Sequence, residues 1–424
     1  MKRRQLLAGG LAVGGAGLMF GLGSWRDRGA NHNAYFRQLS AALDGAGLAR
    51  PTLVIDRQRL LANADIIKQR LQGRYDYRVV AKSLPSLPLL DTVMQHTGTQ
   101  RLMVFHQPFL NLIAREMPGS DLLLGKPMPV AAAASFYQQH RGNRFEPRRQ
   151  LQWLVDSPQR MQQYHELAQQ LDEPMRINLE LDVGLHRGGF ADEQSLVTAL
   201  RILEQSPWLE LGGLMGYEPH VAKMPGLLGG PDAAFSSAQQ RYRELLAIAE
   251  GELKRSLADT TLNAAGSPTY QYYDGKQVAT ELSAGSALVK PTDFDLDSLA
   301  EHQPAAFIAT PVIKSLPSAQ VPGVESLARV QRWLNPNAAQ AFFIYGGYWK
   351  ARPESPAGLA NNSLYGRSTN QEMLMGSNSI DLQPDDWVFL RPTQSEHVFL
   401  QFGDIAVYDQ GSITEQWPVF SQGA

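Results

Sequence analysis

The sequence contains no cysteine. This absence excludes disulfide bonds, thiolate nucleophiles, cysteine-ligated zinc, iron–sulfur clusters and a lipoprotein anchor. The sequence also has no excess of positive charge, since it contains 39 Lys and Arg residues and 41 Asp and Glu residues. Without a basic stripe that carries interleaved aromatic residues, the sequence gives no sign of nucleic-acid binding. The partner that we expect is a small molecule.

Global disorder is excluded by composition, since 43% of the residues are hydrophobic and only 19% are charged. With 424 residues, the chain is too long for one small domain. A barrel of about 250 residues with a smaller partner domain fits this length.

The first thirty residues are typical of an export signal. Lys2, Arg3 and Arg4 precede a glycine-rich apolar run at 6–23, and the segment 3–7 resembles the twin-arginine signal. A membrane anchor is the alternative, although the glycines make this run less hydrophobic than a typical spanning helix. We therefore expect a signal at 1–30 and a periplasmic protein, tethered to the membrane only if the signal stays uncleaved.

Short apolar runs alternate with amphipathic stretches over some 240 residues after Pro51. The runs expected to form strands are 52–55, 77–81, 102–105, 121–124, 152–155, 177–181, 211–217 and 261–265. Such alternation favours parallel strands covered by helices. We predict a (β/α)8 TIM-type barrel domain at 31–295.

The pattern changes after about residue 295, where Pro, Gly and Asn clusters separate short β-type runs. These runs lie at 306–310, 341–345, 387–390 and 398–402. We predict a mostly-β C-terminal domain at 296–424.

Lys82 follows directly on a predicted barrel strand, which places its amine at the end of the barrel where active sites of this architecture lie. A lysine in this position forms a Schiff base if burial lowers its pKa. The alternative is an ordinary solvated lysine, so the surrounding motifs decide.

Two segments late in the barrel combine glycines with hydroxyl side chains at strand ends. Backbone N–H groups at glycines approach a phosphate closely, and hydroxyls add donors. We predict a phosphate cradle made of Gly266, Ser267, Thr269, Gly285 and Ser286. The alternative is that these glycines only form tight turns.

Arg187 lies in another strand-end loop and keeps its charge at every accessible pH. It could hold a phenolate oxygen or a substrate carboxylate. An ion pair within the barrel is the alternative.

Five ordered segments resemble the signatures of fold-type III pyridoxal-phosphate enzymes, in the superfamily of the alanine racemase N-terminal domain. They are VVAKS at 79–83, DVGLHRGG at 182–189, GLMGYEPH at 213–220, GSPT at 266–269 and ELSAGS at 281–286. The chain is most similar to the D-threonine aldolase and D-serine dehydratase group, from about residue 50 to 418. The resemblance implies pyridoxal 5′-phosphate on Lys82, Arg187 near the 3′-oxygen of the cofactor, Tyr217 near its ring and His220 near the substrate.

The sequence also departs from that group. The group usually has a histidine two residues before the lysine, where this chain has Val80. Its metal site aligns on 392–396, with Gln394 in place of a histidine and Glu396 in place of a Cys or Asp. A site of Gln394, Glu396 and His397 would be a poor zinc site but could hold Mg²⁺, Mn²⁺ or Ca²⁺. An ordinary loop is the alternative.

The resemblance implies a lyase that cleaves or dehydrates a D-β-hydroxy amino acid, with Lys82, His220 and Arg187 as catalytic residues. A racemase and a pyridoxal-phosphate-binding protein without turnover stay open as alternatives. A racemase needs a second acid or base, for which Tyr345, Tyr348 and Tyr365 are available. The resemblance also leaves a homodimer open.

Overall fold

The computed structural model describes residues 26–140, 144–317, 335–362 and 366–421. Most of the predicted export signal, at 1–25, lies outside the described residues, as does Tyr365. Within the described part of the chain, no helix has both the length and the apolar character that crossing a membrane requires. The chain divides into two compact units, which are described separately.

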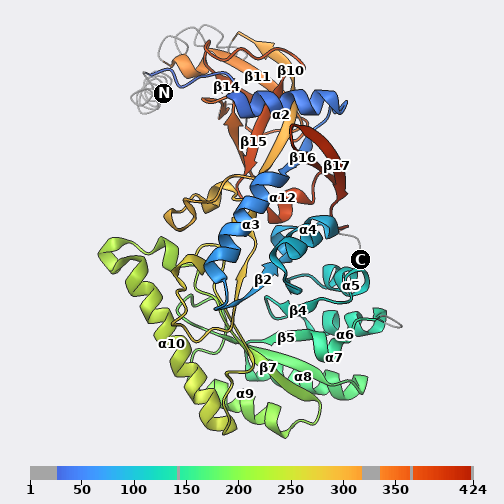
Figure 1. Cartoon of the computed structure of the whole chain (residues 1–424), viewed down its shortest axis with the longest axis vertical. Coiled ribbons are helices and arrows are strands. Elements are labelled where there is room, and N and C mark those ends of the chain that lie inside the picture. The colour runs from blue at the N-terminus through green and yellow to red at the C-terminus, as the bar shows by residue number, and fades with distance from the viewer. Residues whose placement is uncertain (1–25, 141–143, 318–334, 363–365, 422–424) are drawn as a thin grey trace, which may run out of the picture. The chain divides into compact units, whose positions relative to one another are not determined.

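The larger unit is a closed barrel of eight parallel strands, as the sequence predicts. Its strands are β2 (Asp76–Val80), β3 (Arg101–Val104), β4 (Asp121–Leu124), β5 (Leu151–Val155), β6 (Met175–Leu181), β7 (Leu209–Gly216), β8 (Thr261–Ala264) and β9 (Glu281–Ala284). Its main helices, labelled in Figure 1, are α3 (Arg57–Leu71), α4 (Leu87–Thr97), α5 (Gln107–Glu116), α6 (Val130–Gln139), α8 (Pro158–Leu171), α9 (Glu193–Gln205) and α10 (Gly230–Leu253). The barrel closes where β2 pairs with β9, with Val79 beside Ala284.

One expected barrel strand is wrong. The run at 52–55 lies in β1 (Thr52–Asp56), which pairs antiparallel with β10 (Ala306–Leu316) in the sheet of the other unit. The eighth barrel strand is instead β9, at a segment that we expected only to cap a strand. A short apolar run indicates a buried strand but does not identify the sheet to which it belongs.

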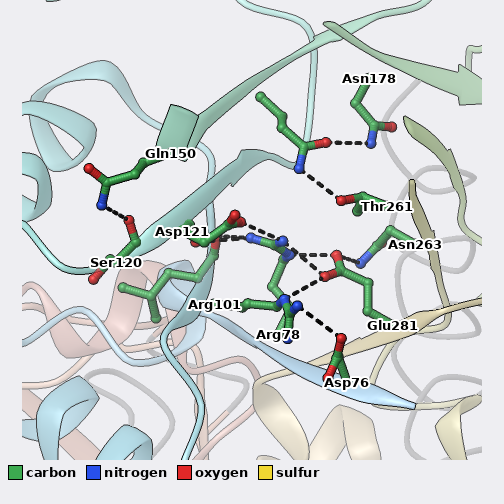
Figure 2. A network of polar contacts seen from close by, with 12 residues as sticks. Asp76, Arg78, Arg101, Ser120, Asp121, Gln150, Asn178, Thr261, Asn263 and Glu281 are labelled. Carbon is green, nitrogen blue, oxygen red and sulfur yellow. Dashed lines mark hydrogen bonds and ion pairs between the residues drawn. The ribbon is translucent and has the colours of Figure 1, made fainter. Parts of the chain in front are cut away.

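The barrel interior holds a network of buried polar side chains (Figure 2). The fully buried Arg78 guanidinium binds Glu281 at 2.6 Å and Asp121 at 2.7 Å. Burial alone would lower the pKa of Arg78, but the two carboxylates more than offset it, so the pKa is raised and the residue stays charged. Asn263 donates to both Glu281 and Ser283 at 2.8 Å. Since Asn263 and Ser283 also line the cavity described below, this network supports its floor.

The smaller unit is a mostly-β sheet domain, in agreement with the predicted class. Its described strands are β1, β10, β11 (Gln340–Tyr345), β12 (Ala351–Ser355), β13 (Ala360–Asn361), β14 (Gln371–Gly376), β15 (Trp387–Pro392), β16 (Asp404–Asp409) and β17 (Ser412–Pro418). Asn33 caps the start of helix α2 (Ala34–Gly45), and its side chain accepts from the N–H of Phe36. The helix buries Phe36 and Leu39 in a core with Phe307 and Phe389, which fixes it on the sheet.

The two units are discontinuous in sequence, unlike the continuous domains that we predict at 31–295 and 296–424. Residues up to Ile55 belong with the sheet, whereas residues 394–405 belong with the barrel. The run at 398–402, which we predict as a strand, forms the end of helix α12 (Glu396–Phe399) and the turn after it. Val398 and Phe399 are buried, so the apolar run reflects helix packing instead of a sheet.

Candidate active site

A cavity opens at the carboxyl ends of the barrel strands and brings together most of the residues that the sequence singles out. It encloses about 670 Å³ of empty space, part of it open to solvent. The predicted site residues that line it are Lys82, Arg187, Tyr217, Gly266, Ser267, Gly285, Ser286 and Glu396. Parallel strands meet at one edge of the barrel, which is why segments far apart in sequence converge here.

Lys82 lies in the short 3-10 turn Ala81–Ser83, immediately after β2. Its Nζ is 2.7 Å from Glu396 Oε1, and it lies 4.5 Å from the centre of the Phe105 ring. The side chain is 37% exposed, so its amine is accessible to a ligand in the cavity. The predicted position at the end of a barrel strand is therefore correct.

Four of the five residues predicted to form a phosphate cradle line the cavity, namely Gly266, Ser267, Gly285 and Ser286. Ser267 Oγ accepts from the N–H groups of Gly285 at 3.1 Å and Ala287 at 3.0 Å. Ser286 Oγ lies 3.0 Å from the hydroxyl of Ser83, which sequence reasoning did not include as a site residue although it adjoins Lys82. A Cβ at Gly285 would lie only 2.7 Å from the backbone oxygen of Val80, so only glycine fits here without rearrangement.

Thr269 has a different place from the one predicted. It is fully buried and does not line the cavity. Its Oγ1 donates to Glu218 Oε1 at 2.7 Å and accepts from the N–H of Gly266 at 3.1 Å. Thr269 therefore stabilises the loop that contains Gly266 and Ser267 without lining the cavity itself.

Glu218 is the buried partner of this loop, with 1% of its surface exposed. Burial raises its pKa to about 7, although hydrogen bonds from Thr269, the Ala265 backbone and Tyr273 act in the opposite direction. Burial thus favours the protonated form of this carboxyl group to a higher pH than is usual for a glutamate.

Arg187 and Tyr217 form one wall of the cavity. The Arg187 guanidinium carbon lies 5.3 Å from the centre of the Tyr217 ring, in the range of a cation–π contact. Burial raises the pKa of Tyr217 to about 12, against the effect of Arg187, so its hydroxyl stays protonated. A Cβ at Gly266 would lie 2.5 Å from Cε2 of Tyr217, and this glycine therefore lets the ring approach the cradle.

His220 does not line the cavity. Its ring packs near Gly184, where a Cβ would lie 3.4 Å from Nε2 of the histidine. Burial lowers the pKa of His220, and His186 lowers it further, while Asp182 opposes both. The imidazole is therefore neutral at pH 7, and its predicted contact with substrate stays a prediction.

The three residues predicted as metal ligands do not form a ligand set. Gln394 Nε2 donates to Asp293 Oδ2 at 3.1 Å, Glu396 binds Lys82, and His397 is exposed. Among the described residues, no group of three or more His, Cys, Asp or Glu side chains could hold a metal ion. The metal site that the resemblance implies therefore stays a prediction.

Glu180 is a cavity residue that sequence reasoning missed. It lies in β6, and burial raises its pKa to about 7, with Asp156 and Asp182 adding to the effect and Arg187 opposing it. A carboxylate next to the carboxyl end of the strand run at 177–181 is a signal that could have identified it.

These residues fit pyridoxal phosphate by the chemistry of their donors. The cavity offers an amine for the aldehyde, hydroxyls and close-approach glycines for the phosphate, and a guanidinium for an anionic oxygen. The apolar groups beside Lys82, namely Phe105, Met103 and Met215, provide surface for a ring.

Comparison with known proteins gives a match over residues 55–293 to the family described as alanine racemase, N-terminal domain. No curated protein sequence matches significantly. Among solved structures, D-threo-3-hydroxyaspartate dehydratase from Delftia sp. is similar, with a TM-score of 0.68, 17% identity and coverage of 88% of this chain and 98% of that one.

Two further solved structures are also similar. D-threonine aldolase from Filomicrobium marinum has a TM-score of 0.68 and 15% identity, covering 88% of this chain and 95% of that one. Alanine racemase from Bacillus anthracis, with bound L-Ala-P, has a TM-score of 0.66 and 13% identity, covering 87% and 98%. At these identities the likeness shows the fold and leaves the reaction open.

Proposed function

Because the chain belongs to the alanine racemase N-terminal domain family, whose enzymes use pyridoxal phosphate, we propose that it is a lyase that cleaves or dehydrates a D-β-hydroxy amino acid. The observation that carries this proposal is that Lys82 and the hydroxyl and glycine cradle share one cavity. The names of two similar structures, a dehydratase and an aldolase, support the choice of a lyase over the other activities of the family.

The residues have distinct parts in the proposed site. Lys82 Nζ would carry the cofactor, Ser83, Ser267 and Ser286 would surround its phosphate, and Arg187 would face its 3′-oxygen. When bound, pyridoxal phosphate acts as an electron sink that labilises a bond at the substrate Cα.

Glu180 would supply a proton donor in the cavity, because burial raises its pKa to about 7. Dehydration needs such a donor for the departing β-hydroxyl. A racemase would use an acid to return a proton to Cα, so the choice between these reactions rests on the product assay below.

The first test is cofactor binding by the purified full-length chain. We expect visible absorbance that borohydride removes, with a mass increase on the Lys82 peptide. Lys82→Ala should abolish both signals, whereas Lys126→Ala, an exposed lysine just after another barrel strand, should keep them. Retention of the signals in Lys82→Ala would refute the proposal.

The second test is a panel of D- and L-β-hydroxy amino acids, with and without added Mn²⁺, Mg²⁺ or Zn²⁺. Glycine with an aldehyde identifies an aldolase, and a keto acid with ammonia identifies a dehydratase. Interconversion of enantiomers without either product would instead identify a racemase. A bound cofactor with no turnover on the panel would favour the binding-protein alternative.

The location of the protein is a separate proposal, supported by Arg3, Arg4 and the apolar run after them. We propose export to the periplasm by the twin-arginine pathway. Replacing both arginines by lysine should retain the protein in the cytoplasm, as measured by cell fractionation. An unchanged distribution would contradict the proposal.

A further inference from the structure

We propose that Glu396 is the counter-ion of the Lys82 nitrogen, and this role rests on the proposed attachment of the cofactor to Lys82. Glu396 Oε1 lies 2.7 Å from Lys82 Nζ, a distance typical of a charge-assisted hydrogen bond. The residue that the family resemblance aligned with a metal ligand thus contacts the reacting atom itself.

The position of Glu396 is fixed by its surroundings within the barrel unit. It opens α12, whose last two residues, Val398 and Phe399, are 1% and 0% exposed. Just before the helix, the Gln394 amide donates to Asp293. The backbone that carries Glu396 is therefore fixed on both sides, and its carboxylate is held by the contact with Lys82.

Other charged groups of the cavity do not take this role. Arg187 lies over the Tyr217 ring, and Glu180 lies on β6, where Arg187 is the cation that acts on it. Tyr217 stays neutral, and Glu396 contributes to raising its pKa. Of the two carboxylates that line the cavity, the one in an ion pair with Lys82 is Glu396.

The expected effect is on the proton affinity of the Lys82 nitrogen. Both side chains are partly exposed, at 37% and 38%, so solvent weakens their attraction. Because a carboxylate this close attracts a positive charge, removing its charge should make a positive charge on the Lys82 nitrogen less favourable.

The experiment is a pH titration of the visible absorbance of the cofactor-loaded protein without substrate. We expect Glu396→Gln to lower the midpoint, Glu396→Asp to lie between it and the unchanged protein, and Glu204→Gln, an exposed carboxylate on α9, to have no effect. A Glu396→Gln midpoint equal to that of the unchanged protein would overturn the inference.

A second measurement does not depend on cofactor binding. Reductive methylation of Lys82 in the cofactor-free full-length protein, followed by peptide mass, reports how much of the amine is neutral. Glu396→Gln should accelerate it measurably near pH 7, because the amine loses its anionic partner, and an equal rate would overturn the counter-ion role.

These outcomes are separable from failure of the proposed function. If the unchanged protein takes up no cofactor, the proposed function fails, while methylation still tests the pairing of Glu396 with Lys82. If Mn²⁺ moves the absorbance midpoint in the unchanged protein and not in Glu396→Gln, the carboxylate is a metal ligand and the inference is wrong.

Discussion

Replacing the buried Glu218 by glutamine should make the protein more stable at alkaline pH and change little in acid. The folded-state pKa of this carboxyl group is raised to about 7 from an ordinary value of 4.5. Folding therefore favours its protonated form, and stability is lost as the pH rises from about 4.5 to about 7. The shift of roughly 2.5 units corresponds to about 3 kcal/mol once the group is fully ionised.

Glutamine is a suitable replacement because the contacts of Glu218 do not require a charge. Thr269 Oγ1 donates to Glu218 Oε1, and a glutamine oxygen accepts the same bond. Glu218→Gln should therefore keep the 2.7 Å contact and remove the cost of ionisation. The native cradle loop between Ala265 and Thr269 should stay in place.

The assay is urea unfolding of both proteins at matched pH values from about 4 to about 9. The difference in free energy should be near zero at the acid end and approach about 3 kcal/mol in favour of Glu218→Gln above pH 8. Glu180 titrates in the same window with the same sign, but both proteins contain it, so its contribution cancels in the difference. A difference that does not change with pH would refute the reasoning.

Three further predictions follow from the barrel. Arg78→Met should destabilise the protein by about 3–5 kcal/mol in urea unfolding, because it leaves the Glu281 carboxylate buried without its main partner; an effect below about 1 kcal/mol would contradict this. Gly285→Ala should weaken cofactor retention in dialysis without unfolding the protein, because its Cβ would meet the Val80 backbone at 2.7 Å; equal retention would be the contrary result. In the active enzyme, kcat/KM should fall as the pH rises through about 7, because Glu180 loses its proton. Glu180→Gln should lose most activity, and its remaining kcat/KM should no longer fall in this pH range. If the fall persists in the variant, Glu180 is not its source.

The barrel could be predicted from sequence because its strands are short apolar runs separated by helical patterns. An apolar run does not show with which strand it pairs. The sequence therefore predicts a barrel strand at 52–55, whereas β1 pairs with β10 in the other sheet. In β9, Glu281 and Ser283 alternate with apolar residues, so a search for short apolar runs does not identify it as the eighth strand. The polar residues there serve the buried network, a tertiary requirement that a local pattern cannot reveal.

The convergence of Lys82, Gly266 and Gly285 in one cavity was predictable, because each lies within two residues of the end of a barrel strand. The electrostatics of the site were not. The sequence shows that Glu396 is a carboxylate, but its contact with Lys82 depends on residues 394–405 belonging to the barrel unit. The role of Thr269 likewise depends on the buried Glu218 behind it.

The two carboxyl groups of the cavity have different environments, and this difference assigns their chemistry. Glu396 lies 2.7 Å from the Lys82 amine, whereas burial and acidic neighbours raise the pKa of Glu180 to about 7. In the proposed function, Glu180 is therefore the proton donor and Glu396 the partner of the lysine nitrogen. Glu180→Gln should accordingly leave the absorbance midpoint of the lysine-bound cofactor unchanged, while Glu396→Gln shifts it, and a shift of equal size in both variants would contradict this division of roles.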